Sequence, residues 1–340
     1  MPFKPILALT LPALLSLTVA ATAEVPTGSD SMPAEIDLAS WTVGDIDQLP
    51  DDEYGRAARY GLELATRTFA HIGPEVADEA TRFSGNNLAC TSCHQDAGTK
   101  PFAMPWVGVS AAFPQYRARE NSLQTVEERV NGCMERSMAG RPLPLDSAEM
   151  RAFTAYIHFL SRGIPVGARV IGAGTIPDPA PARAADPEAG RLVFDEHCAS
   201  CHGEDGLGLR EGEAGDLAGY LYPPLVGEDS YNDGAGMYRV MMAYRFILAN
   251  MPEGADHENR ILTPDEAFDV AAYINTQPRG AKAGMEADFP DRLRKAPDMP
   301  FAPWAGDFPA EQHKFGPFKP IAEWQAQELK LRREAEAAAN

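Results

Sequence analysis

The feature that most constrains this chain is a five-residue pattern, Cys-x-x-Cys-His, that occurs twice, at residues 90–94 and 198–202. In this pattern two thiols bond to the vinyl groups of one haem, and the adjacent histidine becomes an iron ligand. The repeated pattern therefore predicts two covalently bound haem c groups. The predicted haem-binding residues are Cys90, Cys93 and His94 for the first group and Cys198, Cys201 and His202 for the second.

Two other chemistries use paired cysteines. A zinc site can be built from two such pairs, but zinc does not require a histidine directly after each second cysteine. A redox dithiol usually follows a strand in an alternating strand–helix pattern, whereas no stretch here shows sustained strand alternation. Haem attachment is therefore the favoured interpretation of both motifs.

The N-terminus, residues 1–23, reads as an export signal. Lys4 precedes an apolar run from residue 6 to residue 20, and small residues follow at 21–23. The run contains Pro12 and is short for a bilayer span, so cleavage is favoured over anchoring. No later stretch is apolar enough to cross a membrane. We therefore expect a periplasmic protein without stable membrane insertion.

The 340 residues carry a formal net charge of −19. Nucleic acid is excluded as a partner, because its binding needs a basic surface. The favoured interpretation of this acidity is that it keeps the protein soluble. A basic electron-transfer protein would also suit it, whereas an anionic substrate would need a local positive patch.

Composition and helical spacing predict an all-α fold with two small cytochrome c-like helical haem domains. Helices are expected from Tyr54, after a cap at Asp146, after a cap at Asp186, and after Thr263, which begins a capping box that Glu266 completes. The expected order is a flexible leader at 24–50, a first haem domain at 51–172, a Pro/Ala-rich linker at 173–185, a second haem domain at 186–280, and a long C-terminal tail at 281–340 that wraps over the domains and ends in a helix.

The fifth cysteine, Cys133, has no disulfide partner once four cysteines bind haem. It lies in the first haem domain, where its thiolate could ligate the first iron, or it could be a buried structural thiol. Arg129 and Ser137 stand four residues before and after it, on one face if the stretch is helical. A guanidinium and a hydroxyl beside a reactive sulfur suit a doubly charged oxyanion. The neighbouring Arg117 and Arg141 are expected only to solvate the surface.

Spacing leaves Met237 and Met251 open as the sixth ligand of the second haem. Met237 follows a glycine-rich stretch, and Met251 stands in a loop before the last capped helix. Met241 and Met242 are assigned to the core, because methionines at helical spacing usually pack there.

The chain resembles the dihaem thiosulfate dehydrogenases, which are tetrathionate-forming cytochromes. The resemblance covers roughly residues 54–322. It rests on residues 85–89, 129–137, 222–225, 234–237, 250–252 and 312–318.

The resemblance implies an active site at the first haem, with His94 and Cys133 as iron ligands and Arg129 and Ser137 lining the pocket. It implies that the second haem relays electrons and is ligated by Met237. Some members carry a lysine directly before that methionine, whereas this chain has Gly236.

The implied reaction oxidises two thiosulfates to tetrathionate and is reversible in principle. Its two electrons would pass to a soluble acceptor, either a small cytochrome c or a high-potential iron–sulfur protein. Two alternatives are a plain electron-transfer cytochrome c and a haem subunit of a larger sulfur-oxidising complex. The Arg129 and Ser137 pair favours an enzyme, and two complete haem domains favour a self-contained one.

Overall fold

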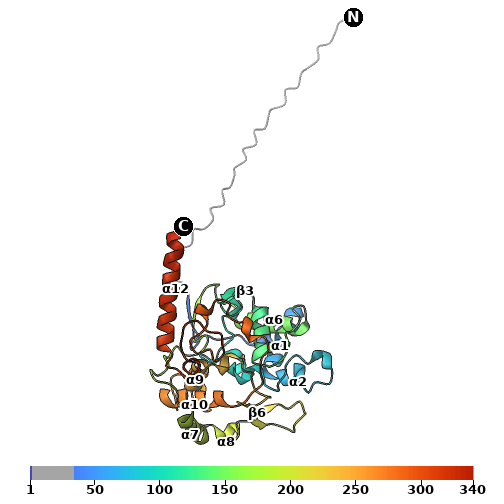
Figure 1. The fold of residues 1–340 in the computed structure, drawn as a ribbon. Helices are drawn as coiled ribbons and strands as arrows, with labels where there is room; N and C mark the ends of the chain where they lie inside the picture. The colour runs from blue at the N-terminus through green and yellow to red at the C-terminus, as the bar shows by residue number, and fades with distance from the viewer. Residues whose placement is uncertain (2–33, 340) are drawn as a thin grey trace. The chain divides into compact units, whose positions relative to one another are not determined.

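Helices form the framework of this protein (Figure 1). The computed structural model describes Met1 and residues 34–339, so the predicted export signal and the first part of the leader lie outside the described residues, apart from Met1. Residues 34–340 form one unit that contains both haem motifs. Within the described residues the strands are two or three residues long. The predicted all-α fold with two cytochrome c domains is confirmed.

The first haem domain is built on two helices that cross at a glycine. Helix α1 (Glu53–Thr66) packs against α6 (Ala148–Leu160). A Cβ atom added to Gly61 of α1 would lie 2.2 Å from the carbonyl oxygen of Ala152 on α6, so only glycine permits this approach. The cap of α6 is Ser147 rather than the expected Asp146, because the Ser147 hydroxyl accepts the hydrogen bond from the Met150 amide.

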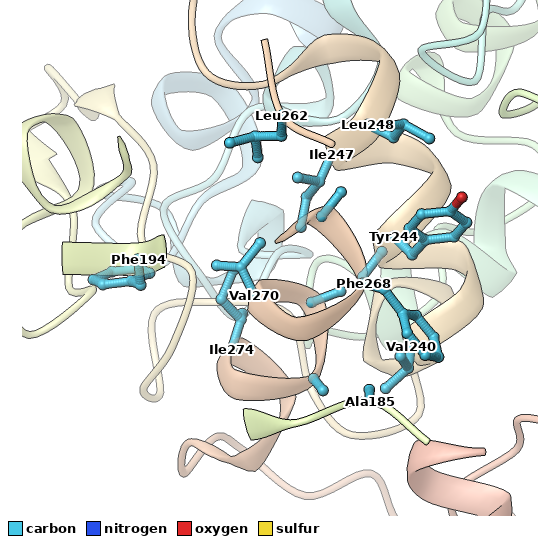
Figure 2. Packing of buried hydrophobic residues seen from close by; sticks show 14 of the residues in the cluster. Ala185, Phe194, Val240, Tyr244, Ile247, Leu248, Leu262, Phe268, Val270 and Ile274 are labelled. Atoms are coloured by element: carbon cyan, nitrogen blue, oxygen red, sulfur yellow. The ribbon is translucent and has the colours of Figure 1, made fainter. Parts of the chain in front are cut away.

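The second haem domain repeats this arrangement. Helix α7 (Pro187–His197) crosses α10 (Pro264–Thr276), and a Cβ atom on Gly190 would lie 2.0 Å from the carbonyl oxygen of Asp269. Figure 2 shows the core between α7, α9 (Val240–Asn250) and α10, where Tyr244 lies beside Phe268 and Phe194 lies at the edge of the cluster. The expected caps are confirmed, because Asp186 caps α7 and Thr263 forms a capping box with Glu266 at α10.

The expected flexible leader needs a correction from residue 34 onward. Strand β1 (Glu35–Asp37) pairs in parallel with β4 (Arg169–Ile171), which follows α6. Leu38 is 6% exposed and packs with Trp41 on the apolar cluster around α1 and α6. These apolar side chains anchor residues 34–50 to the first haem domain.

The linker and the tail both pack on the domains. Ile176 and Ala185 are buried in the second domain core, and Phe318 of the tail joins them. Trp304 stacks on His313 with ring centroids 4.6 Å apart, so aromatic side chains of the tail pack against one another. The tail ends in α11 (Ala310–Phe315) and α12 (Lys319–Ala339), which confirms the expected terminal helix.

The remaining elements are short. These elements are α2 (Thr68–Ile72), α3 (Gln95–Gly98), α4 (Val109–Ala112), α5 (Val126–Arg136), α8 (Ala199–His202), the antiparallel pairs β2 (Gln115–Arg117) with β3 (Ser122–Gln124) and β5 (Leu209–Arg210) with β6 (Tyr220–Tyr222), and the 3-10 turns η1 (Ile46–Gln48), η2 (Glu79–Thr81), η3 (Cys90–Ser92), η4 (Gly236–Tyr238), η5 (Met285–Ala287) and η6 (Arg292–Arg294). None of the helices among the described residues has the length and apolar character of a membrane span.

Candidate functional site

The first haem motif orients its histidine through a backbone contact. The Nδ1 atom of His94 lies 2.5 Å from the carbonyl oxygen of Met104, and because a carbonyl only accepts, Nδ1 carries the proton. Nε2 therefore carries the free lone pair of the ring, as a metal-ligating histidine requires. The loop that supplies this carbonyl holds Asp96, Ala97, Phe102 and Met104 at positive φ, which side-chain-bearing residues rarely adopt.

The thiols of the first motif are available for bond formation. Cys90 and Cys93 form no disulfide. The Thr68 hydroxyl lies 3.3 Å from the Cys90 sulfur and also accepts the Cys90 amide proton at 3.0 Å. Burial raises the pKa of both thiols to about 12, so they are neutral at physiological pH. These two thiols and the oriented His94 ring are the donor set that a covalently attached haem needs.

Cys133 is placed beside His94 by helix α5. Thr125 and Glu128 form the capping box that starts this helix. One turn later the Nη1 atom of Arg129 donates to the Cys133 sulfur at 3.0 Å. Burial raises the pKa of Cys133, but the charge of Arg129, its hydrogen bond to the sulfur and the neighbouring His94 outweigh burial and lower the pKa to about 6. The sulfur is therefore a thiolate at neutral pH and contacts the ring of the predicted proximal histidine.

Ser137 ends the same helix as its C-cap. Its carbonyl oxygen accepts a hydrogen bond from the buried Asn86 side chain at 3.0 Å. No group of the described residues bonds its hydroxyl, which leaves that hydroxyl available to a ligand. The structure thus brings Arg129, Cys133 and Ser137 onto one short helix, as their spacing predicts.

Arg117 was expected only to solvate the surface, and the structure corrects this. It lies on β2, is partly buried, and interacts electrostatically with Arg129 and Cys133. Burial lowers the pKa of Arg117, the charge of Arg129 lowers it further, and Glu120 and Cys133 raise it. Two guanidinium groups therefore act on one sulfur. Sequence spacing carries no signal for this electrostatic interaction, because it depends on how β2 folds back toward α5.

The C-terminal tail also reaches the Cys133 helix. Arg136 pairs with Asp288 of the tail at 2.8 Å, and both side chains are only 10% exposed. Arg119 stands 3.8 Å from the other oxygen of Asp288. This buried carboxylate interacts with two guanidinium groups of the first domain. The sequence analysis did not predict a role for Asp288.

The second motif lines a cavity of about 940 Å³. The Nδ1 atom of His202 lies 2.8 Å from the Pro223 carbonyl oxygen, so its Nε2 is likewise the free lone pair. Met237 and Met251 both line this cavity, and the Asn275 side chain donates to the Met237 carbonyl at 3.0 Å. The volume and the donors fit a haem group. Cys198 and Cys201 complete the predicted attachment site on the wall of the cavity.

The two haem sites adjoin each other. Cys93 of the first motif also lines the cavity of the second. The Asn232 side chain donates to the Glu135 carbonyl at 2.9 Å, and Asn86 bridges the carbonyls of Ser137 and Ser230 at 3.0 Å each. The end of the Cys133 helix is thereby fixed to the loop that leads to Met237.

Comparison with known proteins agrees with this arrangement. Residues 80–166 match the family described as SoxA/TsdA, cytochrome c domain, and residues 187–278 match the family described as cytochrome c. The chain is 36% identical to a thiosulfate dehydrogenase of Psychrobacter arcticus over 73% of this chain and 71% of that protein. It is 41% identical to a thiosulfate dehydrogenase of Allochromatium vinosum over 68% of this chain and 81% of that protein.

A solved structure shares the fold. It is the as-isolated form of thiosulfate dehydrogenase TsdBA from Marichromatium purpuratum, with a TM-score of 0.64 and 34% identity. The match covers 72% of this chain and 51% of that chain, so this chain corresponds to about half of that protein.

Proposed function

The chain belongs to the thiosulfate dehydrogenase family, and from this premise we propose that it joins two thiosulfate ions into one tetrathionate with release of two electrons. The observation that carries the proposal is the 3.0 Å contact between Arg129 and the Cys133 sulfur. A thiolate held beside two guanidinium groups supplies the local positive patch that an anionic substrate needs on an acidic protein.

Cys133 is the proposed nucleophilic centre, and the chemistry balances at its sulfur. The Cys133 thiolate and the outer sulfur of one thiosulfate form a sulfur–sulfur bond as two electrons leave. A second thiosulfate then attacks the thiosulfate sulfur that is bonded to Cys133. This attack makes the central bond of tetrathionate and releases the Cys133 thiolate. Arg129 and the Ser137 hydroxyl hold the sulfonate oxygens, and Arg117 adds positive charge.

The residues that would hold the cofactors are the two motif sets. Two covalently bound haem c groups are proposed, with His94 and Cys133 as iron ligands of the first and His202 and Met237 of the second. When bound, these groups would accept the two electrons. Met251 is the alternative sixth ligand, because it lines the same cavity.

Location and partners belong to the same proposal. The predicted export signal supports a periplasmic enzyme. Covalent haem attachment supports the same location, because it takes place outside the cytoplasm. Tetrathionate reduction by the same residues is open, because breaking the central sulfur–sulfur bond with two electrons is the reverse of its formation. A soluble one-electron carrier is the proposed acceptor.

The test mixes haem-loaded protein with thiosulfate and an artificial electron acceptor. We expect two thiosulfates to be consumed and two electrons delivered for each tetrathionate formed. An electron-transfer cytochrome or a subunit without its own turnover would give no tetrathionate despite carrying two intact haems. That result would overturn the proposed activity.

A further inference from the structure

We propose that the hairpin around β5 and β6, residues 203–223, is the surface on which a positively charged electron-carrier protein docks. This inference rests on the proposed function, because it names the partner that would receive the electrons. The hairpin directly follows the second haem motif in the chain. Its position, its exposed apolar side chains and its charge each point to this role.

The hairpin is fixed to the haem ligand at both ends. The Gly208 amide donates to the His202 carbonyl at 2.8 Å, and the Pro223 carbonyl accepts from the His202 ring at 2.8 Å. Leu221 and Tyr222 of β6 line the cavity that fits the second haem. A protein that covers this hairpin therefore sits beside the site of the second haem, the predicted electron relay, which short-range electron transfer requires.

Exposed leucines are concentrated here. Of the twelve strongly exposed large apolar side chains among the described residues, four fall between residues 207 and 221. Three of them do not line the cavity, so a bound haem would not cover them. Large apolar side chains left exposed close together in one segment are a feature of interaction surfaces. The four are Leu207 at 49%, Leu209 at 49%, Leu217 at 43% and Leu221 at 58% exposed.

Acidic residues alternate with these leucines along the hairpin. Residues 203–223 hold five acidic side chains and one basic side chain, Arg210. Arg210 is already paired with Asp229 at 2.9 Å. Glu253, whose carboxylate accepts a hydrogen bond from Tyr222 at 3.1 Å, adds a further negative charge at the cavity mouth. The acidic residues of the hairpin are Glu204, Asp205, Glu211, Glu213 and Asp216.

An exposed hairpin that is rich in leucines and carboxylates favours a carrier whose surface is positively charged and partly apolar. Complementary charge raises the encounter rate and orients the partner, whereas a small apolar contact lets the complex dissociate after one electron has passed. Transient electron-transfer interfaces bury less than about 1,200 Å² in total, which suits a surface of this kind. In each encounter the reduced enzyme loses one electron and the oxidised carrier gains one.

The test measures this electron transfer directly. Haem-loaded enzyme is reduced with dithionite and mixed in a stopped-flow instrument with an oxidised, basic, single-haem cytochrome c. The double variant Glu211→Lys/Glu213→Lys should lower the bimolecular rate about tenfold at low salt, with the difference shrinking as salt rises. Leu209→Gln should lower the rate at every salt concentration, because apolar contact is not screened.

Matched control variants lie on α12, which is drawn apart from β6 in Figure 1. Leu331 is 49% exposed, as is Leu209, and Glu323 and Glu334 are also exposed. Leu331→Gln and Glu323→Lys/Glu334→Lys should leave the rate unchanged. With an acidic cytochrome c the hairpin charge reversal should instead speed the transfer.

Two results would overturn the docking surface. One is an unchanged rate in the hairpin variants, and the other is an equal loss in the hairpin and α12 variants. Because dithionite reduces the enzyme in this experiment, the outcome does not depend on turnover. A parallel mixing with thiosulfate tests the proposed activity separately, since failure of thiosulfate to reduce the haems counts against that activity alone.

Discussion

Replacing Arg129 with glutamine removes the guanidinium that contacts the Cys133 sulfur at 3.0 Å. A hydrogen bond to a charged group contributes about 1.5–3 kcal/mol. At about 1.4 kcal/mol per pKa unit, its loss should raise the pKa of Cys133 by roughly one to two units. The pKa of this thiol is about 6 in the intact protein. The variant thiol should therefore become partly protonated near neutral pH.

The assay is an acid titration of the haem-loaded, oxidised protein, followed through the absorption spectrum of the first haem. With Cys133 as the proposed iron ligand, its protonation would release the sulfur from the iron, so a higher pKa would move ligand loss to a higher pH. Bound iron lowers the pKa of a ligating thiol, so the informative quantity is the shift of the midpoint between variant and parent protein. We expect a rise of about one to two pH units for Arg129→Gln.

Arg129→Lys is the matched control, because it keeps the positive charge but loses the planar fork of donors. Its midpoint should fall between those of the parent and the glutamine variant. A glutamine variant whose midpoint equals or lies below that of the parent would refute the claim that Arg129 holds Cys133 as a thiolate.

Three further predictions follow from other contacts. Asp288→Ala should lower the free energy of unfolding by about 3–5 kcal/mol, because Arg136 would be left buried without its partner; urea denaturation measures this. Asn275→Leu removes the donor to the Met237 carbonyl, so with Met237 as the proposed ligand it should weaken the methionine-to-iron charge-transfer band and lower the potential of the second haem, which a redox titration measures. Thr263→Ala should cost about 1 kcal/mol through loss of the α10 cap, as thermal unfolding would show.

Features fixed by neighbouring residues were predictable from the sequence. The capping box at Thr263 and the cap at Asp186 each depend on hydrogen bonds within three residues. The contact between Arg129 and Cys133 spans one helical turn, so the spacing alone brings the two side chains together. The cap of α6 was misplaced by one residue, because aspartate and serine are both good caps and stand side by side there.

Features that depend on long-range packing were missed. Arg117 reaches the site from a separate strand, and Asp288 comes from the tail more than 150 residues after Arg136 in the chain. The pairing of β1 with β4 joins segments that are 134 residues apart, so leader composition gives no sign of it. The sequence did not decide between Met237 and Met251 as the sixth ligand of the second haem, and in the structure both side chains line the same cavity.

The central claim is that Cys133 performs the chemistry, and Cys133→Ala tests it most directly. The variant would be purified with both haems, its haem content measured, and its thiosulfate turnover compared with that of the parent enzyme. The account predicts full haem content with loss of tetrathionate formation, because no sulfur remains to form the adduct. Turnover equal to that of the parent enzyme would contradict it.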